Sequence, residues 1–139
     1  MNWIAWALLS AVFAALTAIF AKIGIAGIDS NLATAVRTTV ILVITWGMAA
    51  SFGNVAELGA YSRRTWVFLI LSGLATGASW LCYFRALQLG EASRVAPLDK
   101  LSVVFVVVFA ALFLQEKITW HQVIGGALIA GGAVILARY

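Results

Sequence analysis

The chain has 139 residues, of which 64% are hydrophobic and only 10% are charged. A soluble domain keeps about a quarter of its residues charged, and a core of this length cannot hide so much apolar surface from water. The composition therefore excludes a soluble globular domain and predicts an all-α integral membrane protein. The net charge of +4 does not indicate nucleic-acid binding, because the basic residues are scattered singly apart from Arg63 and Arg64.

Five apolar segments are long enough to cross a bilayer core, which needs roughly 20 helical residues. They lie at about residues 3–25, 32–52, 66–89, 95–114 and 120–137 and form one domain over residues 1–139. The first segment lacks a basic n-region and is too long for the apolar part of a signal peptide, so we interpret it as a membrane helix. Thr119, with Gln122 three residues later, predicts a capping box at the start of the last helix.

The basic residues are balanced between the two faces of this five-helix unit. The face that holds the N-terminus has Arg63, Arg64 and Lys117, and the opposite face has Lys22, Arg94 and Arg138. Membrane orientation normally follows an excess of Lys and Arg on the cytoplasmic side. Two alternatives stay open: insertion in both orientations, or one orientation fixed by the two arginines of the longest loop.

Five charged residues lie within the predicted spans: Lys22 near the end of the first, and Arg37, Arg85, Asp99 and Lys100 in the later ones. Ionisable side chains inside a membrane are costly and mark functional sites by default. Long side chains near a helix end can reach the headgroups, which is the alternative for Arg85. A helix that begins near Pro97 would leave Asp99 and Lys100 at the interface, whereas one capped by Ser93 would bury them deeper. The sequence does not decide between these two starts.

Hydroxyl side chains recur along single faces of the predicted helices, at the spacing of helical turns. The stripes contain Ser10 and Thr17; Thr34, Thr38 and Thr45; Ser72, Thr76 and Ser79; and Ser102. We predict an interior cavity lined by Ser10, Thr17, Thr38, Ser79 and Ser102. The alternative is hydrogen bonding between helices.

The intramembrane charges and nearby aromatic residues are the candidate substrate-binding groups: Arg37, Trp80, Tyr83, Arg85, Asp99 and Lys100. Trp80 and Tyr83 would form walls, because a cation over an aromatic face is held in place. Asp99 would orient an arginine through a bidentate pair or carry a coupling proton.

Small residues predict close helix packing or a dimer contact. Gly73 and Gly77 form a GxxxG pair, and the stretch "GGALIAGG" places Gly125 and Gly132 seven residues apart. No catalytic site, metal site or cofactor is predicted. His121 is the only histidine, and no base accompanies the hydroxyl groups at a useful spacing.

The chain resembles the EamA-type members of the drug/metabolite transporter superfamily over nearly its whole length. The resemblance rests on "FAKIGI" at the end of the first span, on Arg37, and on "ALQLGEASRVAPLDKLSVVFVVVFAALFLQEKITWHQVIGGALIAGGAVILA". Larger relatives contain two such units inserted in opposite senses, so the resemblance implies an antiparallel homodimer, one chain being half of an inverted-repeat transporter in a prokaryotic inner membrane. The last helix is similar to the dimer helix of the small multidrug transporters, but the first span lacks their membrane glutamate.

Two functions stay open at this point. We favour a secondary transporter of a small polar metabolite that works by alternating access. Positive charge exceeds negative charge near the spans, which favours an anionic or zwitterionic substrate. The alternative is a non-transporting subunit, or a flippase subunit for a lipid-linked substrate, that works with a second small membrane protein. The expected partners are membrane lipid, the small-molecule substrate and a second copy of the chain, without nucleic acid.

Overall fold

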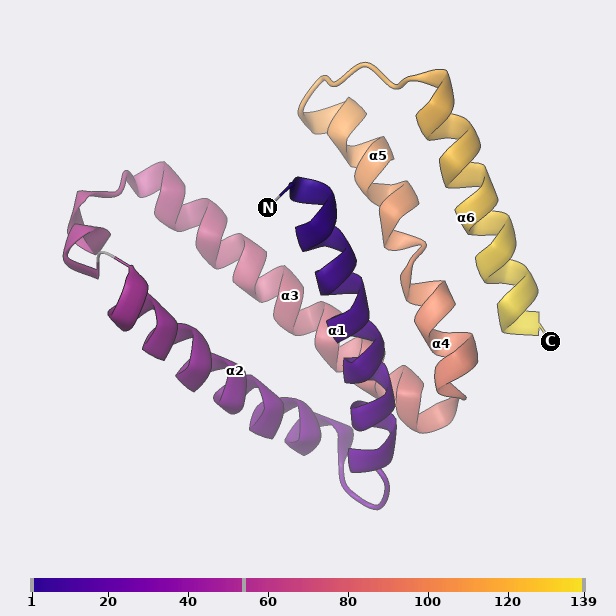
Figure 1. The fold of residues 1–139 in the computed structure, drawn as a ribbon, viewed down its shortest axis with the longest axis horizontal. Helices are drawn as coiled ribbons and strands as arrows, with labels where there is room; N and C mark the ends of the chain where they lie inside the picture. Colours follow the sequence, from indigo (N-terminus) through magenta and orange to yellow (C-terminus); the bar gives the residue numbers. More distant parts are fainter. Residues whose placement is uncertain (1, 54, 139) are drawn as a thin grey trace. The chain divides into compact units, whose positions relative to one another are not determined.

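The computed structural model describes residues 2–53 and 55–138, and over these residues it contains helices and no strand. In chain order the elements are α1 (Trp3–Gly24), α2 (Ser30–Phe52), the 3₁₀ helix η1 (Val55–Ala60), α3 (Arg63–Leu89), α4 (Ala92–Asp99), α5 (Ser102–Phe113) and α6 (Trp120–Arg138) (Figure 1). Four single helices and the α4–α5 segment are each long and apolar enough to cross a membrane. The predicted all-α fold with five spans is confirmed.

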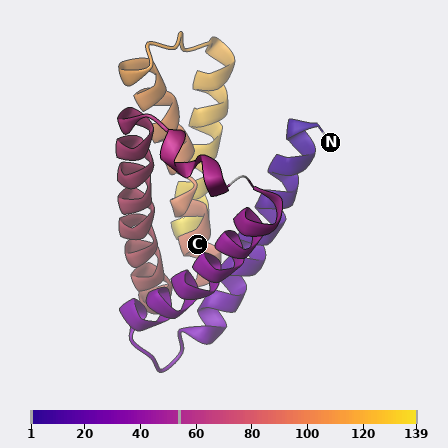
Figure 2. The same cartoon turned by 90° about the vertical axis from the view of Figure 1, so that its left-hand side faces the viewer.

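The chain divides into two compact units, one of residues 24–88 and one that combines α1 with the chain from Leu89 onward. In the first unit, α2 and α3 meet where α2 begins and α3 ends, and they diverge toward η1 (Figure 2). Gln88 closes the narrow end, because its Nε2 donates to the Ile28 carbonyl at 2.7 Å. Asp29 caps α2 by accepting hydrogen bonds from the N–H groups of Asn31 and Leu32.

In the second unit, α6 lies alongside both α4 and α5 (Figure 1). Ala133 is buried on α6, and a Cβ added at Gly126 would lie 3.9 Å from a methyl group of Val104 on α5. The Thr119 N–H donates to Gln122 Oε1 at 2.8 Å, and the Gln122 N–H donates to Thr119 Oγ1 at 3.4 Å. The predicted capping box is therefore present at the start of α6.

The fourth span is not one continuous helix. It begins at Ala92 with Glu91 as N-cap, includes Pro97 inside α4, and breaks at Lys100 and Leu101 before α5 starts. The N–H groups of Lys100 and Leu101 donate to carbonyls only three residues earlier, each at 3.0 Å. The helix begins two residues ahead of the deeper start that the sequence allowed, since Glu91 and not Ser93 is the N-cap, and Pro97 lies inside the helix. At 1.5 Å per residue, Asp99 lies about 10 Å inside this span.

Candidate functional site

A groove of about 430 Å³ lies between α2 and α3. Hydroxyl groups line it from both helices, Thr38 and Thr45 from α2 and Ser72 and Thr76 from α3, and Trp80 lies at one end. Ile41, Leu42 and Leu69 complete its apolar wall, together with Gly73 and Gly77. Two of the hydroxyl stripes recognised in the sequence therefore face a single hollow.

The threonine hydroxyls of this groove donate to their own helices. Thr38 Oγ1 donates to the Thr34 carbonyl at 2.8 Å, and Thr45 Oγ1 donates to the Ile41 carbonyl at 2.8 Å. Thr76 does the same toward Ser72 at 2.9 Å. Since each proton is used within its helix, these oxygens face the groove as hydrogen-bond acceptors, and these hydrogen bonds do not join α2 to α3.

Gly73 and Gly77 leave space in the groove. A Cβ built on either residue would meet no atom within 4 Å, apart from its own helix backbone and neighbours. The missing side chains therefore widen the hollow between α2 and α3. Gly125 and Gly132 on α6 are equally open. A packing or dimer role for the four glycines stays a prediction.

Arg37 lies between two aromatic rings beyond the Trp80 end of the groove. Its guanidinium carbon is 5.2 Å from the ring centre of Trp80 and 4.6 Å from that of Phe84. Tyr83 packs edge-on against Phe84, with ring centres 6.2 Å apart. Arg37 is half-buried, and no carboxylate of the described residues forms an ion pair with it. The sequence suggested that an arginine lies over Trp80 or Tyr83; Arg37 lies over Trp80 and Phe84, and Phe84 is the residue that the sequence did not single out.

Arg85 lies apart from this aromatic pair. Its side chain is exposed and its Nη1 donates to Gln88 Oε1 at 2.9 Å, while Gln88 holds the Ile28 carbonyl. Arg85 thus fixes which way the Gln88 amide points and supports the closed end of the α2–α3 pair. Its role as a binding residue stays a prediction.

Asp99 and Lys100 belong to the other compact unit and flank the break between α4 and α5. Lys100 Nζ is 3.5 Å from Asp99 Oδ2, so the aspartate pairs with its neighbour in sequence. Of the predicted cavity residues, Thr38 lines the α2–α3 groove, whereas Ser79 on α3 does not. Ser10, Thr17 and Ser102 lie in the second unit.

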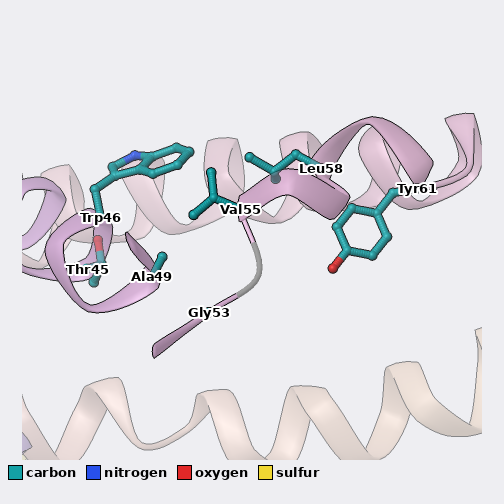
Figure 3. A pocket seen from close by; sticks show the side chains of 7 residues that line it. All are labelled: Thr45, Trp46, Ala49, Gly53, Val55, Leu58 and Tyr61. Carbon is teal, nitrogen blue, oxygen red and sulfur yellow. The ribbon is translucent and has the colours of Figure 1, made fainter. Parts of the chain in front are cut away.

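A second hollow of about 380 Å³ lies between the end of α2 and η1. Trp46 on α2 extends toward Val55 and Leu58 of η1, and Tyr61 lies farther along the chain (Figure 3). Thr45 borders this hollow and the groove. This hollow was not predicted from the sequence, because its wall is mostly apolar and is shared by two separate elements, α2 and η1.

Comparison with known proteins identifies the family to which this five-helix chain belongs. Residues 1–138 match the EamA-like transporter family. A Sinorhizobium protein described as an uncharacterized transporter in the cobO 3′ region is 57% identical over 138 residues, 99% of this chain and 98% of that protein. An uncharacterized protein of Methanocaldococcus jannaschii is 32% identical over 75 residues, 54% of this chain and 55% of its own length. No solved structure matches the chain. With the family match spanning the five helices, this multi-pass membrane protein belongs to the EamA-like transporter family, and its role is that of a transporter.

Proposed function

We propose that the protein is a secondary transporter of a small organic anion or zwitterion, and that Arg37 binds the carboxylate of the substrate. The observation that carries this proposal is a half-buried cation inside a membrane span, held by two rings and by no acidic side chain of the described residues. A charge in this setting needs compensation. The proposal assigns that compensation to the substrate.

The Trp80 and Phe84 rings stabilise the charge of Arg37 before substrate binds, and they leave its hydrogen-bond donors available to the substrate. An arginine at the centre of a membrane helix costs about 3 kcal/mol on insertion scales, and each desolvated cation–π contact returns about 1–2 kcal/mol. Trp80 and Phe84 therefore offset most of the cost of Arg37. Rings over the faces of a guanidinium leave its N–H edge available, and that edge binds a carboxylate through two parallel hydrogen bonds.

The groove next to this arginine suits the remainder of such a substrate. Its volume of about 430 Å³ lies within the usual range for small-molecule sites. The threonine oxygens on its walls accept hydrogen bonds, so they complement an ammonium or hydroxyl group. An amino acid or a hydroxy acid carries both the carboxylate and such a donor.

We also propose that two copies act together, inserted in opposite senses in the inner membrane, and alternate access by rocking about the site. Three features support this arrangement. The basic residues are balanced between the two faces. The match with the Sinorhizobium relative covers 99% of this chain and 98% of that protein. The glycines of α6 leave an open surface on which a second helix can pack.

The test is substrate exchange in liposomes that contain the purified protein and radiolabelled amino acids or organic acids. Arg37→Gln should lower exchange by about 100-fold, because a charged hydrogen-bond pair is lost. Arg64→Gln is the matched control, since Arg64 also lies over a ring, that of Phe68 at 5.8 Å, but in the first turn of α3. Exchange by Arg37→Gln at the wild-type rate would refute the site.

A further inference from the structure

The break between α4 and α5 changes the backbone hydrogen bonds inside a membrane span. In a regular helix, the N–H groups of Lys100 and Val103 would donate to Ala96 and Asp99; here they donate to the carbonyls of Pro97 and Lys100. The carbonyls of Ala96 and Asp99 therefore lose their helical donors. Free carbonyls at the end of a broken membrane helix are groups that bind small cations.

The charges at this break add to the negative electrostatic potential of the Ala96 and Asp99 carbonyl oxygens. Asp99 is the last residue of α4, where the negative end of the helix dipole adds to its carboxylate. Lys100 is the compensating charge, but its distance of 3.5 Å from Asp99 Oδ2 is longer than the 2.7–2.9 Å of a strong charged hydrogen bond. Both side chains are partly exposed, at 39% for Asp99 and 57% for Lys100. The lysine is thus a loosely held counter-ion.

The other charged residues near α4 form contacts with groups other than Asp99, or lie away from the break. Glu91 and Arg94 pair with each other at 3.1 Å in the first turn of α4. Lys22 donates to the Gly90 carbonyl at 2.7 Å. Arg138 ends α6, the helix that packs against α4. Asp99 is therefore the only carboxylate at the break among the described residues.

We propose that the α4–α5 break is a binding site for a small monovalent cation, Na⁺ or a proton, which binds at Asp99 and displaces Lys100. The Asp99 carboxylate can be neutralised either by Lys100 or by the incoming cation. Binding of the cation therefore releases Lys100 from the carboxylate. The coupling role of this site rests on the proposed function, since the cation would drive the substrate that Arg37 binds. The binding itself does not depend on that function.

The experiment measures thermal unfolding of the protein in lipid nanodiscs, without any transported substrate. One series replaces choline chloride by sodium chloride at constant ionic strength and pH, and a second varies pH in choline chloride. A cation that binds only the folded protein raises the unfolding temperature with its concentration. The wild type should shift by several degrees in one series, which identifies the cation.

Three variants test the assignment. Asp99→Asn, which keeps the side-chain shape, should abolish the shift. Glu91→Gln is the matched control on the same helix and should keep it. Lys100→Met removes the competing charge, so the cation concentration for half of the shift should fall about tenfold. The proposal is overturned if wild type and Asp99→Asn respond alike, or if Lys100→Met needs more cation.

Failure of this proposal can be told apart from failure of the proposed function. Arg37→Gln should keep the cation-dependent shift while losing substrate exchange. Glu91→Gln should keep both the cation-dependent shift and the exchange. A wild type that exchanges substrate but shows no cation-dependent shift would overturn the cation site and leave the proposed function standing.

Discussion

The residue that determines most of this chemistry is Arg37. Its guanidinium carbon lies 5.2 Å from the ring centre of Trp80 and 4.6 Å from that of Phe84, and both rings come from α3. A flat, delocalised cation fits between two rings, whereas the compact ammonium of lysine is more strongly hydrated and offers no fork of donors. Recognition should therefore depend on the shape of the cation as well as on its charge.

Arg37→Lys should consequently lose substrate exchange almost as completely as Arg37→Gln, although it keeps the positive charge. The measurement is the same liposome exchange assay, with thermal unfolding as the check of folding. Arg64→Lys, made at the other arginine–aromatic contact, should leave exchange within about twofold, because its contact lies at the exposed start of α3. Wild-type exchange by Arg37→Lys would show that a point charge is sufficient and that the two rings do not shape recognition.

At the scale of elements, the α2–α3 pair differs from a close-packed helix pair. The two helices approach at one end and separate toward the other (Figure 2). The groove is lined by residues of both helices. Glycine in a helix usually allows a neighbouring helix to come near. Here Gly73 and Gly77 border empty space, so we assign them to the substrate path.

Gly77→Leu should therefore block substrate exchange without unfolding the protein. The new side chain would fill the groove beside Trp80, and leucine favours a helix over glycine by up to about 1 kcal/mol. Gly47→Leu on α2, where a Cβ is equally free but outside the groove, is the control and should retain exchange. If Gly77→Leu instead separates cross-linkable dimers into monomers, the GxxxG pair is a contact between chains.

At the scale of the whole molecule, orientation in the membrane depends on very few charges. Each face of the unit has three basic residues, and two of those on the N-terminal face are neighbours, Arg63 and Arg64. With five spans, the two ends of the chain lie on opposite sides. We propose that copies of the chain enter in both senses, as the antiparallel dimer requires.

Reporters fused to the C-terminus, one active in the cytoplasm and one active outside it, should both give signal in the wild type. Replacing Arg63 and Arg64 by Gln leaves one basic residue on the N-terminal face against three on the other. The positive-inside rule then holds the C-terminus in the cytoplasm, so only the cytoplasmic reporter should stay active. Signal from a single reporter in the wild type would exclude the antiparallel homodimer.

The sequence predicted the spans, because apolar length is a local signal, and it suggested that a ring holds an arginine without deciding which arginine lies over which ring. The break at Lys100 was not predictable from hydropathy, which counts apolar residues and ignores which carbonyl each N–H reaches. Phe84 was also not predicted as a contact of Arg37, because the sequence alone does not distinguish a phenylalanine that covers a cation from one that faces lipid. Predicting the groove would have required knowing that the hydroxyl stripes of α2 and α3 face each other. That arrangement depends on contacts between residues distant in the sequence.

The contact of Arg37 with Trp80 and Phe84 has a consequence for membrane insertion during synthesis. The ribosome releases α2 before α3 exists, so Arg37 reaches the membrane before Trp80 and Phe84 have been synthesised. Alone, α2 is a less apolar span than α1 and exposes an arginine to lipid. Contact with the two α3 rings lowers the cost of that charge in the bilayer. We therefore expect α2 to insert more efficiently together with α3, as a hairpin, than alone.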